Sequence, residues 1–99
     1  MSLEAEFEEA LHGTYNAAKE RGYIATYFLQ MLEEHGGVET AKRLLAKSDV
    51  QAGLYKLWEL DLLDQSMEVL ILQKKFRSLF TETEIVESRR RLEALGYFK

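Results

Sequence analysis

Residues 54–72 (LYKLWELDLLDQSMEVLIL) are the part of this chain that most restricts how it can fold. Twelve of the 19 residues are apolar, and they include Trp58, the only tryptophan. Five charged side chains interrupt the stretch, whereas a membrane span needs about 20 mostly apolar residues. We therefore predict that the stretch forms the middle of a protein core, with Trp58 facing inward.

A helical periodicity runs through the chain, which contains no proline to interrupt it. In residues 3–21, Leu3, Phe7, Leu11 and Tyr15 recur every four residues and so share one face of a helix. Similar patterns predict further helices over residues 24–35, 38–47, 49–60, 65–74 and 82–95.

Capping residues and glycines set the expected helix ends. Residues 48–51 (SDVQ) and 81–84 (TETE) fit the capping box, in which a serine or threonine oxygen accepts a backbone N–H in the first turn. Gly36 and Gly37 are expected to end the second helix, one as a left-handed cap and the other adding backbone freedom. Gly96 is expected to end the last helix, and the two aromatic residues after it should fold back.

These features predict an all-α fold, an irregular bundle of five to six short helices around a single core. Ninety-nine residues are the size of one domain, so we assign residues 1–99 to a single domain. Residues 1–3 carry no informative pattern and are compatible with an added leader sequence. Ile24 should face inward from the second helix, and residues 69–72 are compatible with either a helix or a short strand.

The sequence offers no pattern typical of an enzyme, a cofactor site or a metal site. Cysteine is absent, which excludes thiolate ligands and disulfides and suits a cytoplasmic protein without a signal peptide. His12 and Glu8 share a helix face, but zinc needs at least three protein ligands and His35 lies on another helix. No serine lies in a nucleophile motif. We therefore predict a non-enzymatic chain with no evident small-molecule substrate.

Basic side chains gather near the C-terminus of a chain whose net charge is −4. That net charge argues against unspecific nucleic-acid binding by the whole molecule. Residues 74–99 nevertheless carry seven basic against four acidic side chains. The basic residues that could contact an anion or a partner are Lys74, Lys75, Arg77, Arg89, Arg90 and Arg91.

Two functions follow as hypotheses. The leading one is a protein-interaction or accessory domain that binds a protein partner or itself, because many aromatic side chains are available for an interface. The alternative is a nucleic-acid-associated accessory domain that contacts phosphate through the basic C-terminal segment. A helix-turn-helix interpretation of residues 41–58 is disfavoured, because the second helix would bury its apolar side chains and carries acidic neighbours.

A further pattern runs through residues 27–29 and 36–45, Gly53, Leu54, Leu57, Trp58, Glu59, Leu63, Asp64, Ser66, Glu68, Phe76, Leu79, Phe80, Glu84, Arg89, Arg91, Leu92, Gly96 and Tyr97. Through these positions the chain resembles a small bacterial helical domain of unknown function, and the likeness covers about residues 22–97. That domain occurs alone or appended C-terminally to nuclease-like or helicase-like proteins. The resemblance implies no catalytic residues, and it adds to the binding hypotheses only by analogy. Two positions depart from the pattern, with Ala25 where a proline is frequent and Asp61 where a glycine is common.

Overall fold

Six α-helices and two short 3-10 turns make up the secondary structure of the described residues. The computed structural model describes residues 2–47 and 52–98, and within them it contains no strand. The predicted all-α class is therefore confirmed, and the strand alternative at residues 69–72 is wrong. The elements are α1 (Leu3–Glu20), α2 (Thr26–His35), α3 (Gly37–Ala46), α4 (Ala52–Glu59), η1 (Leu63–Gln65), α5 (Met67–Leu72), η2 (Arg77–Leu79) and α6 (Glu82–Ala94).

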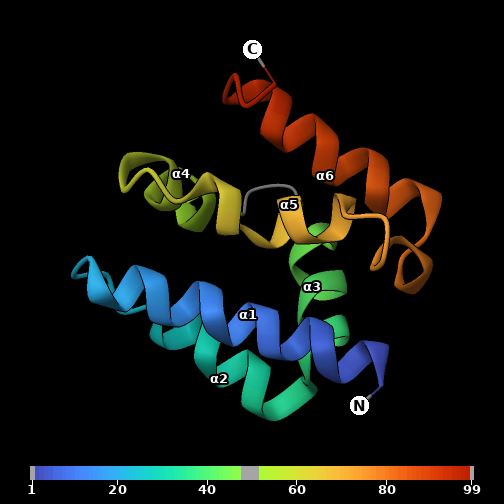
Figure 1. The fold of residues 1–99 in the computed structure, drawn as a ribbon, viewed down its shortest axis with the longest axis horizontal. Helices are drawn as coiled ribbons and strands as arrows, with labels where there is room; N and C mark the ends of the chain where they lie inside the picture. Colours follow the sequence, from blue (N-terminus) through green and yellow to red (C-terminus); the bar gives the residue numbers. More distant parts are fainter. Residues whose placement is uncertain (1, 48–51, 99) are drawn as a thin grey trace.

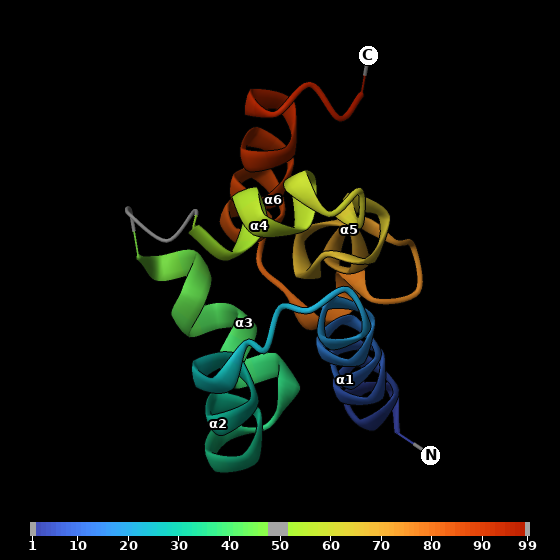
Figure 2. The same ribbon diagram turned by 90° about the vertical axis from the view of Figure 1, so that its left-hand side faces the viewer.

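Helix α5 lies at the centre of the arrangement, between α1 and α6 (Figure 1). Helix α3 packs against α1, α2 and α6, so it joins both ends of the molecule. Seen after a 90° turn, α1 and α2 lie toward one end and α4, α5 and α6 toward the other (Figure 2). The radius of gyration is 12.4 Å, close to the roughly 13 Å expected of a folded chain of about 100 residues.

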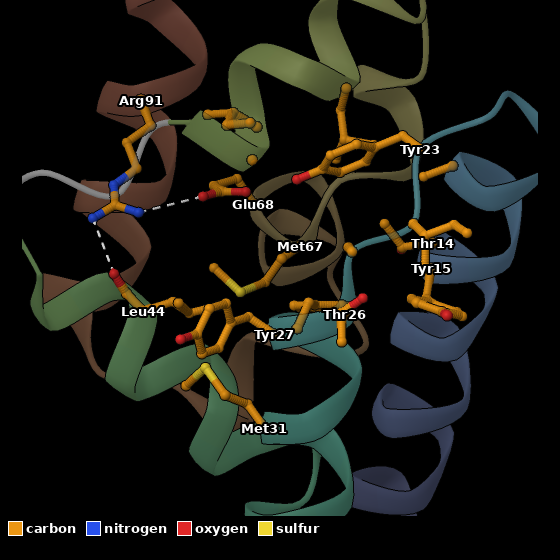
Figure 3. A pocket seen from close by; sticks show the side chains of 17 residues that line it. Thr14, Tyr15, Tyr23, Thr26, Tyr27, Met31, Leu44, Met67, Glu68 and Arg91 are labelled. Carbon is orange, nitrogen blue, oxygen red and sulfur yellow. Dashed lines mark hydrogen bonds and ion pairs between the residues drawn. The ribbon is translucent and has the colours of Figure 1, made fainter.

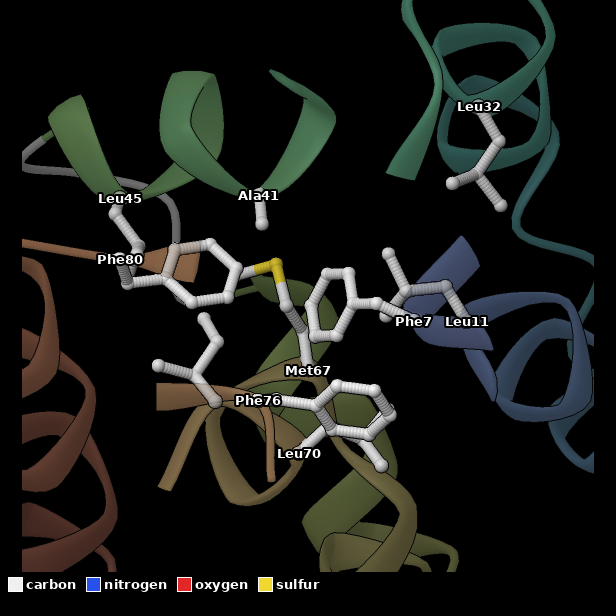
Figure 4. Close-up of a cluster of buried hydrophobic side chains, with 10 residues drawn as sticks. Phe7, Leu11, Leu32, Ala41, Leu45, Met67, Leu70, Phe76 and Phe80 are labelled. Atoms are coloured by element: carbon white, nitrogen blue, oxygen red, sulfur yellow. The ribbon is translucent and has the colours of Figure 1, made fainter. Parts of the chain in front are cut away.

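The core gathers around Phe7, a residue of α1 with no exposed surface (Figure 4). Its ring meets those of Phe76 and Phe80 edge-on, at centroid distances of 5.2 and 5.1 Å. Such pairs add about 0.5–1.5 kcal/mol beyond burial itself. Phe76 and Phe80 flank the η2 turn, and both side chains are buried. The other core residues are Leu11, Leu32, Ala41, Leu45, Met67, Leu70 and Ile71.

Several helix ends lie where the sequence predicts them. The Ser66 hydroxyl accepts the Val69 amide at 3.2 Å and starts α5, and Thr81 starts α6 with a complete capping box. After α6, Gly96 adopts φ 74° and the next amide returns to the Leu92 carbonyl at 3.0 Å. The predicted capping box at residues 48–51 lies outside the described residues.

The start of α1 and the turn after α4 add two details. The Ser2 hydroxyl accepts the Ala5 amide at 3.1 Å, so Ser2 and Leu3 take part in the first helix. Asp61 follows α4 with φ 61°, in the left-handed region where glycine has no steric cost and aspartate is tolerated.

Gly37 serves a close approach between helices and not the backbone freedom we predicted. A Cβ atom at this position would lie 2.7 Å from the Cα atom of Glu8. The Glu8 carboxylate also accepts the Gly37 amide at 3.0 Å and so caps the start of α3 from another helix. Helices α1 and α3 can therefore cross at this point only because Gly37 has no side chain.

Two apolar residues expected inside the core are exposed. Trp58 is 52% exposed and Ile24 is 57% exposed, so both inward predictions are wrong. On a helical wheel Trp58 lies only about 40° from Leu54, which is buried. Helix α4, however, packs mainly against the η1 turn that follows it, and none of the described elements fully covers its Trp58 side.

Candidate functional site

A cavity of about 390 Å³ lies between α4, the α1–α2 connection, α2 and α5, and we name it the α4 cleft (Figure 3). Its walls are mainly apolar, and Phe28, Leu54, Leu57 and Met67 contribute from three helices. The volume lies within the range of about 300–1,000 Å³ that is typical of binding pockets. The cleft is therefore large enough to take up at least one long side chain or a small molecule.

Small residues leave the space that forms the cleft. Ala18 of α1, Ala25 before α2 and Gly53 of α4 all line it. An added Cβ atom at Gly53 would meet no atom within 4 Å. The side chains at these three positions are therefore too short to fill the space between the walls of the cavity.

Two polar contacts fix α4 at the edge of the cleft. The Arg21 guanidinium donates to the Leu60 carbonyl at 2.7 Å, just beyond the end of α4. The Lys56 ammonium lies 5.7 Å from the centre of the Tyr23 ring, a cation–π contact. Both contacts join α4 to the segment that follows α1, so they help to set the width of the cleft.

Glu68 supplies a carboxyl group to the cleft. It lies on α5, lines the cavity and is only 5% exposed. Its nearest charged partner is Arg91, whose Nη1 atom lies 3.5 Å from a carboxylate oxygen. Burial raises the pKa of the Glu68 carboxyl above its usual range. A buried acid with so long an ion pair is a feature that core packing alone does not require.

Arg91 links α6 to the end of α3. Its guanidinium is 1% exposed and donates through Nη2 to the carbonyl oxygen of Lys47 at 2.8 Å. The same nitrogen lies within hydrogen-bond distance of the Leu44 and Leu45 carbonyls, at 3.3 and 3.4 Å. A cation at the C-terminal end of a helix also complements the helix dipole. Arg91 is thus an internal connector, and its guanidinium is not on the surface where we expected a partner contact.

A second carboxylate competes for Arg91. Glu87 accepts Arg91 Nε at 2.7 Å and also accepts two hydrogen bonds from Arg90. The hydrogen bonds from Arg90, together with those from Arg91, lower the pKa of Glu87 to about 2. Glu87 is consequently charged at neutral pH and holds Arg91 more closely than Glu68 does.

Hydroxyl groups complete the polar lining. The Thr14 hydroxyl donates to the Gln65 carbonyl, so this donor is already used. The Tyr23 side chain points its hydroxyl into the cavity, on the side where Glu68 lies (Figure 3). Tyr27, which is 83% exposed, and Thr26 border the same space near the surface.

The first three basic residues of the predicted contact set lie between α5 and the end of η2. Lys74, Lys75 and Arg77 are all exposed. The Lys75 ammonium is 3.5 Å from a Glu6 carboxylate oxygen, and Arg77 Nε donates to the Leu72 carbonyl at 2.9 Å. Lys74 makes no ion pair within residues 2–47 and 52–98.

The remaining two surface arginines lie in the second half of α6. Arg90 pairs with Glu87, and the Arg89 guanidinium lies 5.2 Å from the centre of the Phe98 ring. The segment with Lys74 precedes the other end of this helix (Figure 1). Arg89 is seven residues into a helix that rises about 1.5 Å per residue, which separates the two groups by roughly 10 Å along the axis alone. The structure does not bring the six predicted residues into one patch.

Sequence analysis missed Glu68 and misplaced Arg91, although both leave a signal. Glu68 is the only charged residue in MEVLIL, a run that is apolar on too many sides for a surface helix. Arg91 follows Ser88 by three residues and precedes Leu95 by four, which puts it on the inward face of α6. The sequence thus indicates an inward acid on α5 and an inward arginine on α6, but it does not show that the two face each other.

Two further kinds of site are absent from the part of the chain that the structure describes. No group of three or more histidine, cysteine, aspartate or glutamate side chains is placed to hold a metal ion there. In the same residues no helix combines the length and the apolar character of a membrane span. Comparison with known proteins found no matching family model, no matching curated protein and no matching solved structure.

Proposed function

We propose that this chain is a non-enzymatic protein-interaction domain and that the α4 cleft takes up apolar side chains of a partner protein. The observation that carries the proposal is the α4 cleft itself, an apolar cavity with exposed large hydrophobic side chains on the elements around it. We propose further that the chain acts as an accessory domain of a larger assembly. The resemblance of residues 22–97 supports this role only by analogy.

Exposed apolar side chains gather on the elements that border the cleft. Ile24 and Tyr27 line it and are exposed, and Tyr55 and Trp58 are exposed on α4. Tryptophan and tyrosine supply a large share of binding energy in protein interfaces, and exposed apolar clusters mark interaction sites. The folded chain thus leaves uncovered those residue types that binding to another protein would cover.

The polar groups of the cleft support binding more than catalysis. Neither histidine lines the cavity. The Thr14 hydroxyl is committed to a backbone carbonyl, and Arg91 is held by Glu87 and the end of α3. A nucleophile paired with a general base, which covalent catalysis needs, is not present in the described lining.

The alternative function, phosphate contact through the basic segment, has less support. Arg91 is internal, and the other five basic residues fall into two separate groups. Three of the five, Lys75, Arg77 and Arg90, already have acidic or backbone partners. A fluorescent oligonucleotide titrated at about 50 and 200 mM salt would test it directly, because phosphate contacts lose affinity steeply over that range. Salt-sensitive binding that Lys74→Glu abolishes would favour the alternative.

A peptide selection against the folded domain tests the main proposal. Gly53→Leu adds a side chain to a residue of the cleft lining on α4, at a position where an added Cβ atom meets no atom within 4 Å. Gly13→Leu is the matched control, since Gly13 is also helical, equally free of neighbours and outside the cleft lining. We expect wild-type protein to select peptides rich in apolar residues whose binding Gly53→Leu weakens at least about tenfold and Gly13→Leu leaves unchanged.

Selected peptides that bind both variants equally well would place the interaction elsewhere and contradict the proposal. Light scattering over a range of concentrations checks whether the partner is a second copy of the chain. A dimer that dissociates in Gly53→Leu alone would identify the chain itself as the occupant of the cleft.

A further inference from the structure

We propose that the α4 cleft is selective for a cationic amphiphile, namely a partner lysine side chain whose stem lies along the apolar walls and whose ammonium reaches Glu68. This inference rests on the proposed function and specifies the chemistry of the bound side chain. Lysine combines a flexible four-carbon stem with a compact charge, a shape suited to an apolar cavity that has a carboxylate inside it.

The distances around Arg91 favour a cation in the cleft. Glu87 lies 2.7 Å from Arg91 Nε and is also paired with Arg90, whereas the Glu68 oxygen lies 3.5 Å from Arg91 Nη1. Glu68 is thus a buried carboxylate whose counter-ion is distant. An ammonium that arrives through the cavity can approach this carboxylate more closely than Arg91 does.

Glu68 is also placed to receive such a group. It is 5% exposed yet lines the cavity, so it is shielded from bulk water and reachable from the cleft. Within residues 2–47 and 52–98, Arg91 is the only side chain that donates a hydrogen bond to it. The Tyr23 hydroxyl, which points into the same space, offers a lone pair to the ammonium (Figure 3).

An anionic occupant is disfavoured by the same geometry. A carboxylate in the cleft would meet the charge of Glu68, while Arg91 Nε and Nη2 are committed to Glu87 and the α3 carbonyls. A neutral apolar occupant would fill the walls but leave Glu68 without compensation and further from water. The three classes of occupant should thus bind in the order cation, neutral, anion.

Small probes of matched size test this order. We would titrate hexylammonium, 1-hexanol and hexanoate into the folded chain at about pH 8, where carboxyl groups ordinarily are ionised, and follow amide shifts of residues that line the cleft. Hexylammonium should bind about tenfold more tightly than 1-hexanol. A hydrogen bond between two charged groups is roughly twice as strong as a neutral one, and this difference in free energy corresponds to about a tenfold difference in affinity. Hexanoate should bind most weakly.

Two variants assign the preference to Glu68. Glu68→Gln keeps the size of the side chain and removes its charge, and it should bind the ammonium and the alcohol equally. Glu59→Gln, at an exposed position on α4, changes the net charge by the same amount and should retain the tenfold preference. Far-UV circular dichroism verifies that both variants fold, and the comparison of the three probes on wild-type protein needs no variant.

The possible results separate this inference from the proposed function. Equal binding of the ammonium and the alcohol to wild-type protein would overturn the cation preference and leave the apolar cleft intact. A preference that persists in Glu68→Gln would overturn the assignment to this carboxyl. Binding of none of the three probes would overturn both proposals together.

Discussion

Two apolar regions of this molecule have similar side chains but differ in how completely those side chains are buried. Around Phe7, helices from both ends of the sequence converge, and the rings of Phe76 and Phe80 close the space completely. Around α4, apolar side chains of the same kind line a cavity that the neighbouring small residues leave open, and Trp58 on the same helix is half exposed. The difference lies in what faces each helix and not in the helices themselves. An apolar face is thus a requirement for burial, and only the neighbouring elements decide whether the burial occurs.

The largest test of this contrast is a pair of aromatic truncations. Phe7→Ala should lower the free energy of unfolding by about 3–5 kcal/mol, because it leaves a cavity that its neighbours cannot fill. Trp58→Ala should cost less than about 1 kcal/mol, since half of the side chain is already in water. Urea denaturation of both variants measures the two values. A Trp58→Ala cost as large as that of Phe7→Ala would mean that the α4 side of the molecule is packed like the core.

Removing the charge of Arg91 should have the next largest effect. Arg91→Met keeps much of the apolar stem but leaves the end of α3 and the Glu68 carboxylate without their shared donor. Breaking a buried pair in this way costs about 3 kcal/mol or more. Thermal or urea denaturation gives the value. Arg90→Met is the control on the same helix, and it should cost less than about 1 kcal/mol because Arg90 is a surface residue.

The contact between α1 and α3 gives a smaller and opposite pair of effects. Gly37→Ala should destabilise the protein by about 1–3 kcal/mol, because its Cβ would overlap the backbone of Glu8. Gly13→Ala in α1 meets nothing within 4 Å and should stabilise the protein by up to about 1 kcal/mol through helix propensity. Denaturation midpoints of the two variants should therefore move in opposite directions. Two shifts of the same sign would contradict the close crossing at Gly37.

The two carboxylates around Arg91 should contribute to stability with opposite dependence on pH. The pKa of Glu87 is lowered to about 2, so its stabilising contribution is present above about pH 4.5 and is lost as the pH falls toward 2. The pKa of Glu68 is raised by burial, so its contribution is present below about pH 4.5 and is lost as the pH rises through the folded-state pKa.

Unfolding free energies of wild-type, Glu68→Gln and Glu87→Gln proteins, measured between about pH 2.5 and 8, separate these two contributions. Relative to Glu68→Gln, wild-type protein should be most stable below about pH 4.5 and lose that advantage as the pH rises. Relative to Glu87→Gln, it should lose its advantage only below about pH 4.5. Parallel curves for the two variants would show that both carboxylates share one environment.

Local features of the fold could be predicted from the sequence because they depend on near neighbours. The stripe of Phe7, Leu11 and Tyr15 is buried as its spacing predicts, and both hydrogen bonds of the predicted capping box at Thr81 are present. These features depend on residues within one or two helical turns. Periodicity and capping chemistry were therefore enough to obtain the class of fold, most helix ends and most of the core.

The cleft could not be predicted, because it depends on which helices become neighbours. Nothing near Trp58 in the sequence states that α4 lies at the edge of the molecule. Glu68 and Arg91 are 23 residues apart, and Arg91 lies 44 residues from the Lys47 carbonyl that it binds. A run of three arginines does not by itself show whether a guanidinium is exposed or internal, because that depends on which helix faces it.

The contact of Glu8 with Gly37 bears on how far this domain can be shortened. The carboxylate that accepts the first amide of α3 belongs to α1. A chain that began after α1 would lack Phe7 and Leu11 and would start α3 without this contact. The later helices thus depend on α1 both for a part of their core and for the start of α3. A truncation that removes α1 should therefore destabilise the rest of the chain.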